Sequence, residues 1–533
     1  MILKNQSANS GQKNFFPKRD EFCQQLILTW LVALFGCILF IWSWCYLNNV
    51  SGNYRYKLDG NFNGWSQSFF FDDSSMIQNY SRWIMGFSCS IGSILAVWFL
   101  SKFGYQCAVC IALTLMVLSF PMMIVACPFK GNTLTLSGMI SIKKSFSVLG
   151  TYGQLMATKN SIIGYALFEI FRNFLVVGGM ILVISVQSIA GKLKDPTKIT
   201  LNRLIPLTFS FGVIVATVPF ILGLNVNFLL VKYWYLVTAT LILLTMCLLV
   251  FYLFCTKKNI EAKPYCFAEN KITYLLKNRD IWKFAFFLGI FVFIVLFPTT
   301  IIMKQIIRSS FTNSANFWNS WSEKGNKLND SDYEHFWYIW KIIFFAGSII
   351  GYFFISSFSK TNYKRKKFLL FNFLIGFIFL ILSLFFCYQG YNKSLFLYLC
   401  FLFSFLSGVF LIGIFSVVLL MIHELPDSTC QKTDITLGWI HAIAYLVYVL
   451  LDVLLSSIVN SNSVPECLDL CNIYTRNNYV LVFIIFSILI IFALFLILLL
   501  PHSGYYNGNV WCLNDKEWKI WNWRFRRSDR RNY

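Results

Sequence analysis

Glu169 and Arg172 are the ionisable residues of this sequence most able to act on a ligand. They lie three positions apart in a largely apolar segment, so a helix would place both on one face, where they can pair. A charged group in an apolar environment is energetically costly and is therefore a candidate for function. Two interpretations stay open: a neutral ion pair that holds helices together, or an arginine that binds an anionic group by a bidentate contact.

His441 and Asp452 form a second candidate pair in another apolar segment. They are about three helical turns apart, so they share a helix face without touching each other. Asp452 has no evident counter-ion nearby in the sequence. We therefore expect Asp452 or Glu169 to carry a proton if a proton is used, with His441 as a further candidate. Packing against a partner on another helix is the alternative for Asp452.

The remaining candidates have simpler interpretations. Lys341 lies about one turn inside an apolar segment, and we expect its long stem to carry the ammonium to the interface. Cys107-x-x-Cys110 lies within an apolar segment and is read as packing. Cys467 and Cys471 share a polar connection and could pair or bind a metal, but no histidine is near them, which favours neither.

Long apolar runs must position all of these residues. The hydrophobic fraction is 57%, the mean hydropathy is +0.62 and only 13% of residues are charged. Runs of about 20 apolar residues match the length that crosses a 30 Å hydrocarbon core. We expect an all-α membrane protein with twelve spans, and a weakly apolar stretch near 131–158 leaves the count open by one. The spans are predicted at 26–47, 83–100, 107–127, 162–191, 204–223, 234–255, 282–303, 336–358, 368–388, 395–421, 437–457 and 479–500.

Charge predicts the orientation of the spans. Lys and Arg are more frequent in the termini and the even-numbered connections than in the odd-numbered ones, which places both termini in the cytoplasm. The net charge of +22 then reflects anchoring to anionic lipid rather than binding of nucleic acid. The tail at 518–531 combines Trp and Arg and is expected to lie at the membrane interface.

Internal similarity divides the spans into two halves of six. Gly92-Ser93-Ile94 in the second span matches Gly347-Ser348-Ile349 in the eighth, and each motif precedes a short basic connection. The predicted domains are a cytoplasmic tail (1–22), an N-terminal half (23–255), a linker (256–281), a C-terminal half (282–501) and a basic-aromatic tail (502–533).

This organisation resembles the major facilitator superfamily. Residues 168–172 (Phe-Glu-Ile-Phe-Arg), followed by Gly178 and Gly179, resemble that family's fourth helix, in which an arginine precedes a glycine-rich face. Residues 275–282 resemble the usual beginning of its seventh helix. A composition rich in Phe, Ile, Lys and Asn is typical of an AT-rich bacterium such as a mollicute, so the chain is identified as a divergent bacterial member.

The connection between the second and third spans is similar to the family's best-known motif. That motif carries Gly, then Asp-Arg, then Gly and two basic residues. Here Ser101 stands at the Asp position, Lys102 at the Arg position, and Gly104 matches. The resemblance implies a gating loop at Ser101, Lys102 and Gly104 that lacks the family's carboxylate.

The resemblance implies a secondary active or facilitative transporter that moves a small solute by alternating access. It places the fourth helix on a central cavity, where Arg172 and Glu169 would bind substrate and favour an anionic metabolite such as a sugar phosphate or organic acid. It implies no enzyme activity, no cofactor and no metal. The expected partners are the solute and membrane lipid, with no nucleic acid, and the expected state is a monomer in the plasma membrane.

Two other functional classes stay open. A lipid-linked glycosyltransferase with many spans could hold a divalent metal at Asp72 and Asp73, in the first predicted outer connection. A membrane sensor that transports nothing is the third class.

Overall fold

The computed structural model describes residues 19–50, 65, 74–127, 140–142, 155–157, 159–192, 195–222, 230, 233–256, 275–300, 303, 307, 330–358, 365–389, 394–423, 425, 430–460, 476–501, 505–506 and 509–510. Asp72, Asp73, Cys467 and Cys471 lie outside the described residues, and so does most of both tails.

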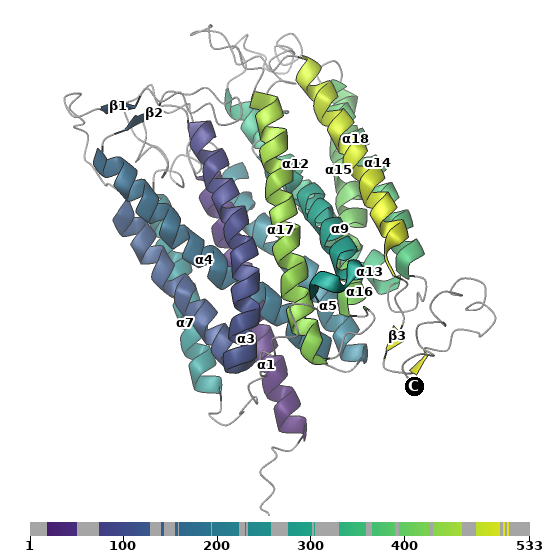
Figure 1. Ribbon diagram of the computed structural model, residues 1–533. Helices are drawn as coiled ribbons and strands as arrows, with labels where there is room; N and C mark the ends of the chain where they lie inside the picture. The colour runs from purple at the N-terminus through teal and green to yellow at the C-terminus, as the bar shows by residue number, and fades with distance from the viewer. Residues whose placement is uncertain are drawn as a thin grey trace, which may run out of the picture.

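The described chain is an all-helical bundle, apart from two small β ladders (Figure 1). The N-terminal half contains α1 (Arg19–Asn49), α3 (Ser74–Ala126), α4 (Lys159–Lys192), α5 (Asp195–Thr217), η3 (Val218–Ile221) and α7 (Trp234–Cys255). The C-terminal half contains α9 (Arg279–Leu296), η4 (Phe297–Thr299), α12 (Asp330–Phe353), α13 (Ile355–Phe358), α14 (Arg365–Gln389), α15 (Ser394–Gly413), α16 (Phe415–His423), α17 (Cys430–Asn460) and α18 (Arg476–Leu499).

The antiparallel ladders lie outside the helices. Strand β1 (Ile140–Ile142) pairs with β2 (Leu155–Ala157), and β3 (Tyr505–Tyr506) pairs with β4 (Asn509–Val510). The weakly apolar stretch that left the span count open contains β1 and β2, so its described residues form a short ladder rather than a thirteenth spanning helix.

Helix α3 supplies two membrane crossings. Its 53 residues are interrupted at Gly104, where φ is 78° and ψ is 177°, a combination open in practice only to glycine. Eleven segments of the described chain are long and apolar enough to span a membrane, and one of them, Tyr80–Ala126, has 47 residues. At 1.5 Å per residue that segment is about 70 Å long, twice what one crossing needs. The twelve predicted spans are therefore present.

The boundaries of the second span differ from the prediction. Hydropathy starts this span at Trp83, but α3 begins at Ser74. Ser81 and Arg82, which resemble polar flanking residues in the sequence, therefore lie inside the helix, and both are buried.

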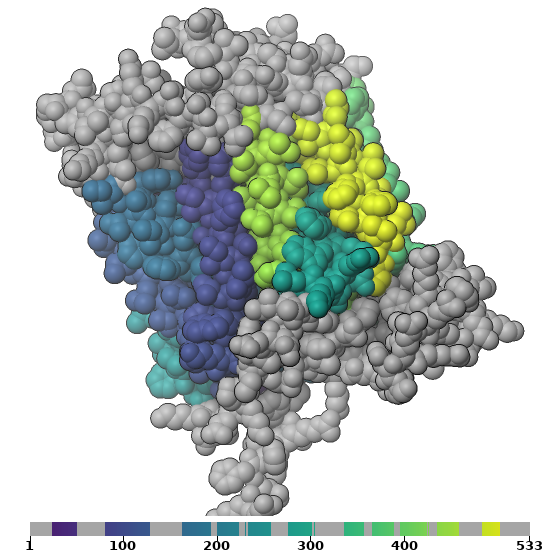
Figure 2. Space-filling view, viewed as in Figure 1, coloured from purple at the N-terminus to yellow at the C-terminus, as the bar shows by residue number. Residues whose placement is uncertain are grey.

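The two halves meet along a few helix pairs. Helix α17 packs against α3, and α12 packs against α5; Figure 1 shows α17 running beside α3. The space-filling view in Figure 2 shows these two helices in direct contact along this face. Residues far apart in the chain can therefore interact across the interface between the halves.

The predicted internal repeat corresponds to equivalent helix packing. A Cβ added at Gly92 of α3 would lie 3.0 Å from Met180 Cβ of α4. A Cβ added at Gly347 of α12 would lie 2.3 Å from the carbonyl oxygen of Phe405 in α15. In both halves the matching glycine therefore brings the second helix close to the fourth.

Candidate functional site

A pocket of about 900 Å³, which includes space open to solvent, lies on the interface between the halves. Helices α1, α4 and α5 line it on one side, and α9, α15, α16 and α17 line it on the other. Its walls are mainly aliphatic and aromatic, with Phe40, Phe209, Phe291 and Phe415 among them. None of the described residues that line it is Asp, Glu, Lys or Arg.

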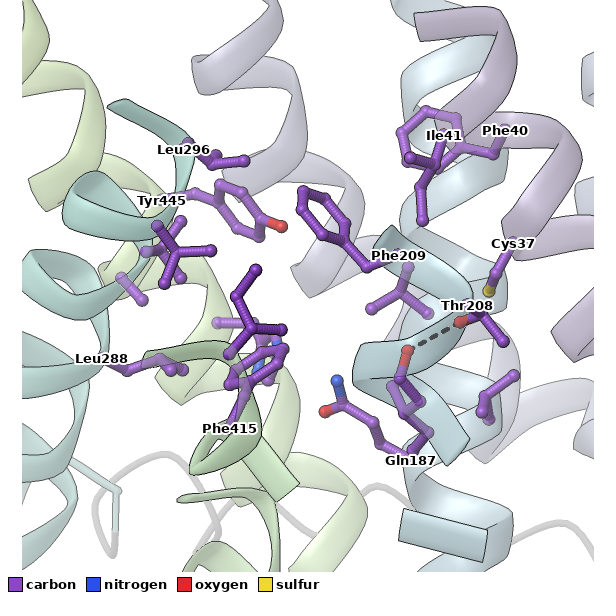
Figure 3. Close-up of a pocket in the computed structure, with 18 of the residues that line it drawn as sticks. Cys37, Phe40, Ile41, Gln187, Thr208, Phe209, Leu288, Leu296, Phe415 and Tyr445 are labelled. Carbon is purple, nitrogen blue, oxygen red and sulfur yellow. Dashed lines mark hydrogen bonds between the residues drawn. The ribbon is translucent and has the colours of Figure 1, made fainter. Parts of the chain in front are cut away.

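A few polar side chains interrupt this apolar lining. Gln187 of α4 is 1% exposed, and its Oε1 atom has no hydrogen-bond partner among the described residues. Figure 3 shows its amide pointing into the space beside Phe415, while the Tyr445 hydroxyl points toward Phe209. Thr208 donates from Oγ1 to the carbonyl oxygen of Ile205 at 2.7 Å. Polar capacity in the pocket is therefore small and partly used within the protein.

His441 also lines the pocket, which is where a residue that couples a proton to transport is expected to lie. Its Nδ1 atom lies 3.1 Å from the carbonyl oxygen of Leu437, so Nδ1 carries the hydrogen in this contact. The sequence did not indicate that the histidine would face the pocket. Its coupling role stays a prediction.

Asp452 has a counter-ion from the other half of the protein. Its Oδ2 atom lies 2.7 Å from Arg82 Nε, and Trp83 Nε1 donates to the same oxygen at 3.0 Å. Arg82 Nη2 also donates to Ser456 at 3.3 Å. We call these four residues the Asp452 cluster. The counter-ion that the sequence near Asp452 lacks is supplied by another helix, because the packing of α3 against α17 brings Arg82 to it.

Asp434 forms a second ion pair between the halves, at the other end of α17. Lys192 Nζ of α4 and the Tyr105 hydroxyl of α3 donate to Asp434 Oδ2 at 2.9 and 3.0 Å. Ser188 of α4 donates to Oδ1. We call Tyr105, Ser188, Lys192 and Asp434 the Asp434 cluster. Sequence reasoning missed it, because Lys192 and Asp434 lie at the ends of apolar segments, where charged residues resemble ordinary flanks.

One face of α17 connects the two clusters to the pocket. Asp434, His441, Tyr445 and Asp452 recur at spacings close to whole helical turns, so they lie along one stripe. The pocket residues His441 and Tyr445 lie between the two aspartates. The predicted shared face of His441 and Asp452 is part of this longer stripe.

Glu169 and Arg172 pair as the sequence predicts. Arg172 Nη1 lies 3.7 Å from Glu169 Oε1, and Ser81 donates to the same carboxylate oxygen at 2.6 Å. Arg172 also donates to Ser81 and, at 2.7 Å, to Asn48 Oδ1 of α1. Its guanidinium lies 5.0 Å from the centre of the Trp65 ring.

This pair lies away from the central pocket. Arg172 is 1% exposed and is enclosed within the N-terminal half, and neither residue is among those that line the pocket. The substrate-binding role expected of Arg172 and Glu169 stays a prediction, and the contacts around them are those of a buried structural pair.

Lys341 joins the halves instead of reaching the interface. Its Nζ donates to Asn49 Oδ1 at 3.2 Å and lies 4.9 Å from the centre of the Trp337 ring, and the residue is 1% exposed. The expected snorkelling was wrong, because Asn49 at the end of α1 and the Trp337 ring hold the ammonium at a buried position. The neighbouring residues Asn48 and Asn49 thus accept hydrogen bonds from two buried cations, Arg172 of α4 and Lys341 of α12.

The predicted gating loop is a short break within α3, as its few residues indicate. Ser101 Oγ donates to the carbonyl oxygen of Trp98 at 2.9 Å, and the exposed Lys102 ammonium lies 4.9 Å from the Trp98 ring. Gly104 provides the break, and Tyr105 directly after it reaches Asp434. The carboxylate absent from this loop has a counterpart in Asp434 on α17. The gating role of the loop stays a prediction.

A twelve-span helical bundle in two halves, with a pocket on their interface, defines a multi-pass membrane transporter. A family model described as "Mycoplasma MFS transporter" matches residues 168–460, more than half of the chain. The chain belongs to this family, and it is a divergent mollicute member of the major facilitator superfamily.

The relatives cover most of the chain. A major facilitator superfamily transporter of Mycoplasma genitalium is 26% identical over 480 residues, which cover 80% of this chain and 83% of that protein. One from Mycoplasma pneumoniae is 25% identical over 551 residues, with 93% of this chain and 97% of that protein covered.

Solved structures share the fold at low identity. A D-xylose-proton symporter superposes with a TM-score of 0.54 at 14% identity, covering 89% of this chain and 98% of that one. A bacterial homologue of the iron transporter ferroportin, in an outward-facing state, gives 0.54 at 10% identity, covering 89% of this chain and 99% of that one. These likenesses confirm the predicted fold and leave the substrate open.

Proposed function

We propose that this protein is a carrier that moves a small uncharged solute across the membrane by alternating access. One observation carries the proposal: an uncharged pocket on the interface between the halves lies between two ion pairs that join those halves. With the predicted orientation, the Asp452 cluster faces outward and the Asp434 cluster faces the cytoplasm.

Each ion pair would act as a gate at its own end of α17. Outward opening requires that Arg82 and Asp452 separate, whereas inward opening requires that Lys192 and Asp434 separate. Both pairs are formed in this structure. Breaking a buried pair costs several kcal/mol unless water or new partners compensate, so substrate contacts in the pocket would offset the loss of one gate at a time.

The lining of the pocket favours an uncharged solute. A buried anion needs a cation or several donors to replace its water, and the described lining includes no Lys or Arg. The anionic substrate expected from the resemblance depends on Arg172, which is engaged by Glu169, Ser81 and Asn48. One relative in fold is a proton symporter of the neutral sugar D-xylose, which is compatible with an uncharged cargo and with His441 as a proton site.

Uptake by proteoliposomes that contain the purified protein tests the proposal. Labelled uncharged solutes and labelled anions of similar size are compared, with protein-free vesicles as the control. We expect time-dependent uptake of at least one uncharged solute and counterflow when the vesicles are preloaded with it. Uptake restricted to anions would contradict the proposed cargo, and the absence of any counterflow would contradict alternating access.

A further inference from the structure

We propose that the central pocket binds a flat, uncharged nitrogen heterocycle that presents a ring N–H beside a ring carbonyl, as pyrimidine and purine bases do. This inference deepens the proposed function and rests on it for the pocket being the transport site. The recognition residue is Gln187 of α4.

Gln187 holds an unused acceptor inside the pocket. Its Oε1 atom is buried and has no hydrogen-bond partner among the described residues, although the side chain as a whole is only 1% exposed. Buried polar atoms in proteins are almost always paired, so an exception that lines a cavity points to a donor that arrives with the ligand. Figure 3 shows the Gln187 amide directed into the pocket rather than into a helix contact.

Trp44 of α1 holds an unused donor in the same lining. Its Nε1 atom is buried without a partner among the described residues, and its ring stacks on Phe40 at 6.3 Å between centroids and 8° between planes. Gly36 of α1 packs against Leu182 of the antiparallel α4, which places Trp44 and Gln187 toward opposite ends of the pocket. Recognition of the edge of the ligand is therefore assigned to Gln187 alone.

The other walls of the pocket are flat and aromatic. Phe291 and Phe415 stack at 5.4 Å between centroids and 27° between planes, while Phe209 and Tyr445 lie opposite each other in Figure 3. Aromatic surfaces of this kind stack favourably on planar rings. The side-chain amide of Gln187 places its oxygen and its NH₂ group side by side, which matches a ring N–H next to a ring carbonyl.

The same lining is poorly suited to a sugar. A hexose carries several hydroxyl groups, and each one that is buried without a partner weakens binding. Thr208 already donates to Ile205, and Nδ1 of His441 already contacts Leu437. The polar groups that remain, on Gln187, Tyr445 and His441, lie among aromatic and aliphatic walls and fit the edge of a heterocycle better than a polyol.

Binding by the purified full-length protein tests this inference, with calorimetry as the readout. The probes are uracil and hypoxanthine, 1,3-dimethyluracil, in which methyl groups replace both N–H hydrogens, and glucose. We expect one of the two bases to bind at least about tenfold more tightly than both dimethyluracil and glucose. If neither base binds, or if glucose binds as tightly, the inference is overturned.

Substitutions at Gln187 then locate the contact. Gln187→Leu and Gln187→Glu should each weaken binding of the base by about tenfold, because the first removes both amide groups and the second removes the donor. Thr217→Val is the matched control and should change binding less than about twofold, since Thr217 does not line the pocket and its hydroxyl donates to the carbonyl oxygen of Val213 in its own helix at 2.7 Å. Only variants whose unfolding temperature is close to that of the wild type are compared. Unchanged affinity in both Gln187 variants would overturn the assignment.

Uptake by proteoliposomes separates this inference from the proposed function. Binding of the base that depends on Gln187, without uptake of any solute, would support the site and contradict the carrier. Uptake of glucose without uptake of either base would contradict the inference and leave the carrier standing.

Discussion

Asp434 and Asp452 lie on the same face of α17, about five helical turns apart, and each binds a basic side chain from the N-terminal half. One helix of the C-terminal half therefore forms an ion pair with the N-terminal half near each of its own two ends. The pocket residues His441 and Tyr445 lie between these two points. A small rotation of α17 relative to α3 and α4 would change the Arg82–Asp452 and Lys192–Asp434 contacts at the same time.

Exchanging the charges of Arg82 and Asp452 should restore part of what a single substitution in the Asp452 cluster removes. Arg82→Ala should lower stability by about 3–5 kcal/mol and abolish most transport, because it leaves a buried carboxylate without its cation. The double variant Arg82→Asp with Asp452→Arg should recover part of both losses. Thermal unfolding and uptake measure the two effects, and Arg279→Ala, which changes an exposed arginine, is the control. A double variant no better than the single ones would argue against a direct pair.

The Asp434 cluster should control access to the pocket from its own end. Asp434→Ala removes the ion pair and both hydroxyl contacts, so we expect the pocket to open more often at that end. Cys37 lines the pocket, and its alkylation by a small maleimide, followed by mass spectrometry of its peptide, should be several-fold faster in the variant. Cys89 is buried and does not line the pocket, so its rate should stay unchanged. Equal acceleration at Cys89 would indicate general loosening.

Loss of the Arg172 contacts should appear as loss of stability. Arg172→Ala leaves Glu169 buried without its cation, and we expect a decrease of about 3–5 kcal/mol in the free energy of unfolding, measured as a lower unfolding temperature. The ratio of uncharged to anionic solute taken up by the remaining folded protein should not change. A specific loss of anion uptake with unchanged stability would instead support the substrate-binding role predicted from the sequence.

The crossing of α12 and α15 should not tolerate a side chain at Gly408. A Cβ there would lie 1.8 Å from the carbonyl oxygen of Phe344, so the two backbones must separate. We expect Gly408→Ala to cost about 3 kcal/mol or more. In Gly36→Ala the nearest atom is the flexible end of Leu182 at 2.7 Å, and the cost should be below about 1 kcal/mol. Comparison of the unfolding temperatures checks the difference.

The glycosyltransferase alternative makes the opposite prediction from the carrier at Asp72 and Asp73. A carrier with the central pocket described above should keep its uptake rate within about twofold when both are replaced by Ala, since solvated acidic residues contribute little. An enzyme that holds a divalent metal there would lose its activity. Uptake and metal binding, both measured on the double variant, separate the two.

The spans, the two halves and the family could be predicted from the sequence. Apolar runs of the length of a membrane are a local property of the chain, and so is the (i, i+3) spacing that pairs Glu169 with Arg172. The glycine matched in both halves also predicts a close helix contact. These features depend on neighbours along one helix, which is why they could be predicted without the tertiary structure.

Only the tertiary structure decided which polar residues meet. Arg82 and Lys192 resemble ordinary flanking charges in the sequence, and their partners Asp452 and Asp434 lie hundreds of residues away. Gln187 resembles any single polar residue in a long apolar helix, yet it faces the pocket. Hydropathy and helical period define the faces of a helix, but the packing of one half against the other determines what each face meets. For that reason the two ion pairs between the halves and the pocket of this transporter could be located only in the folded protein.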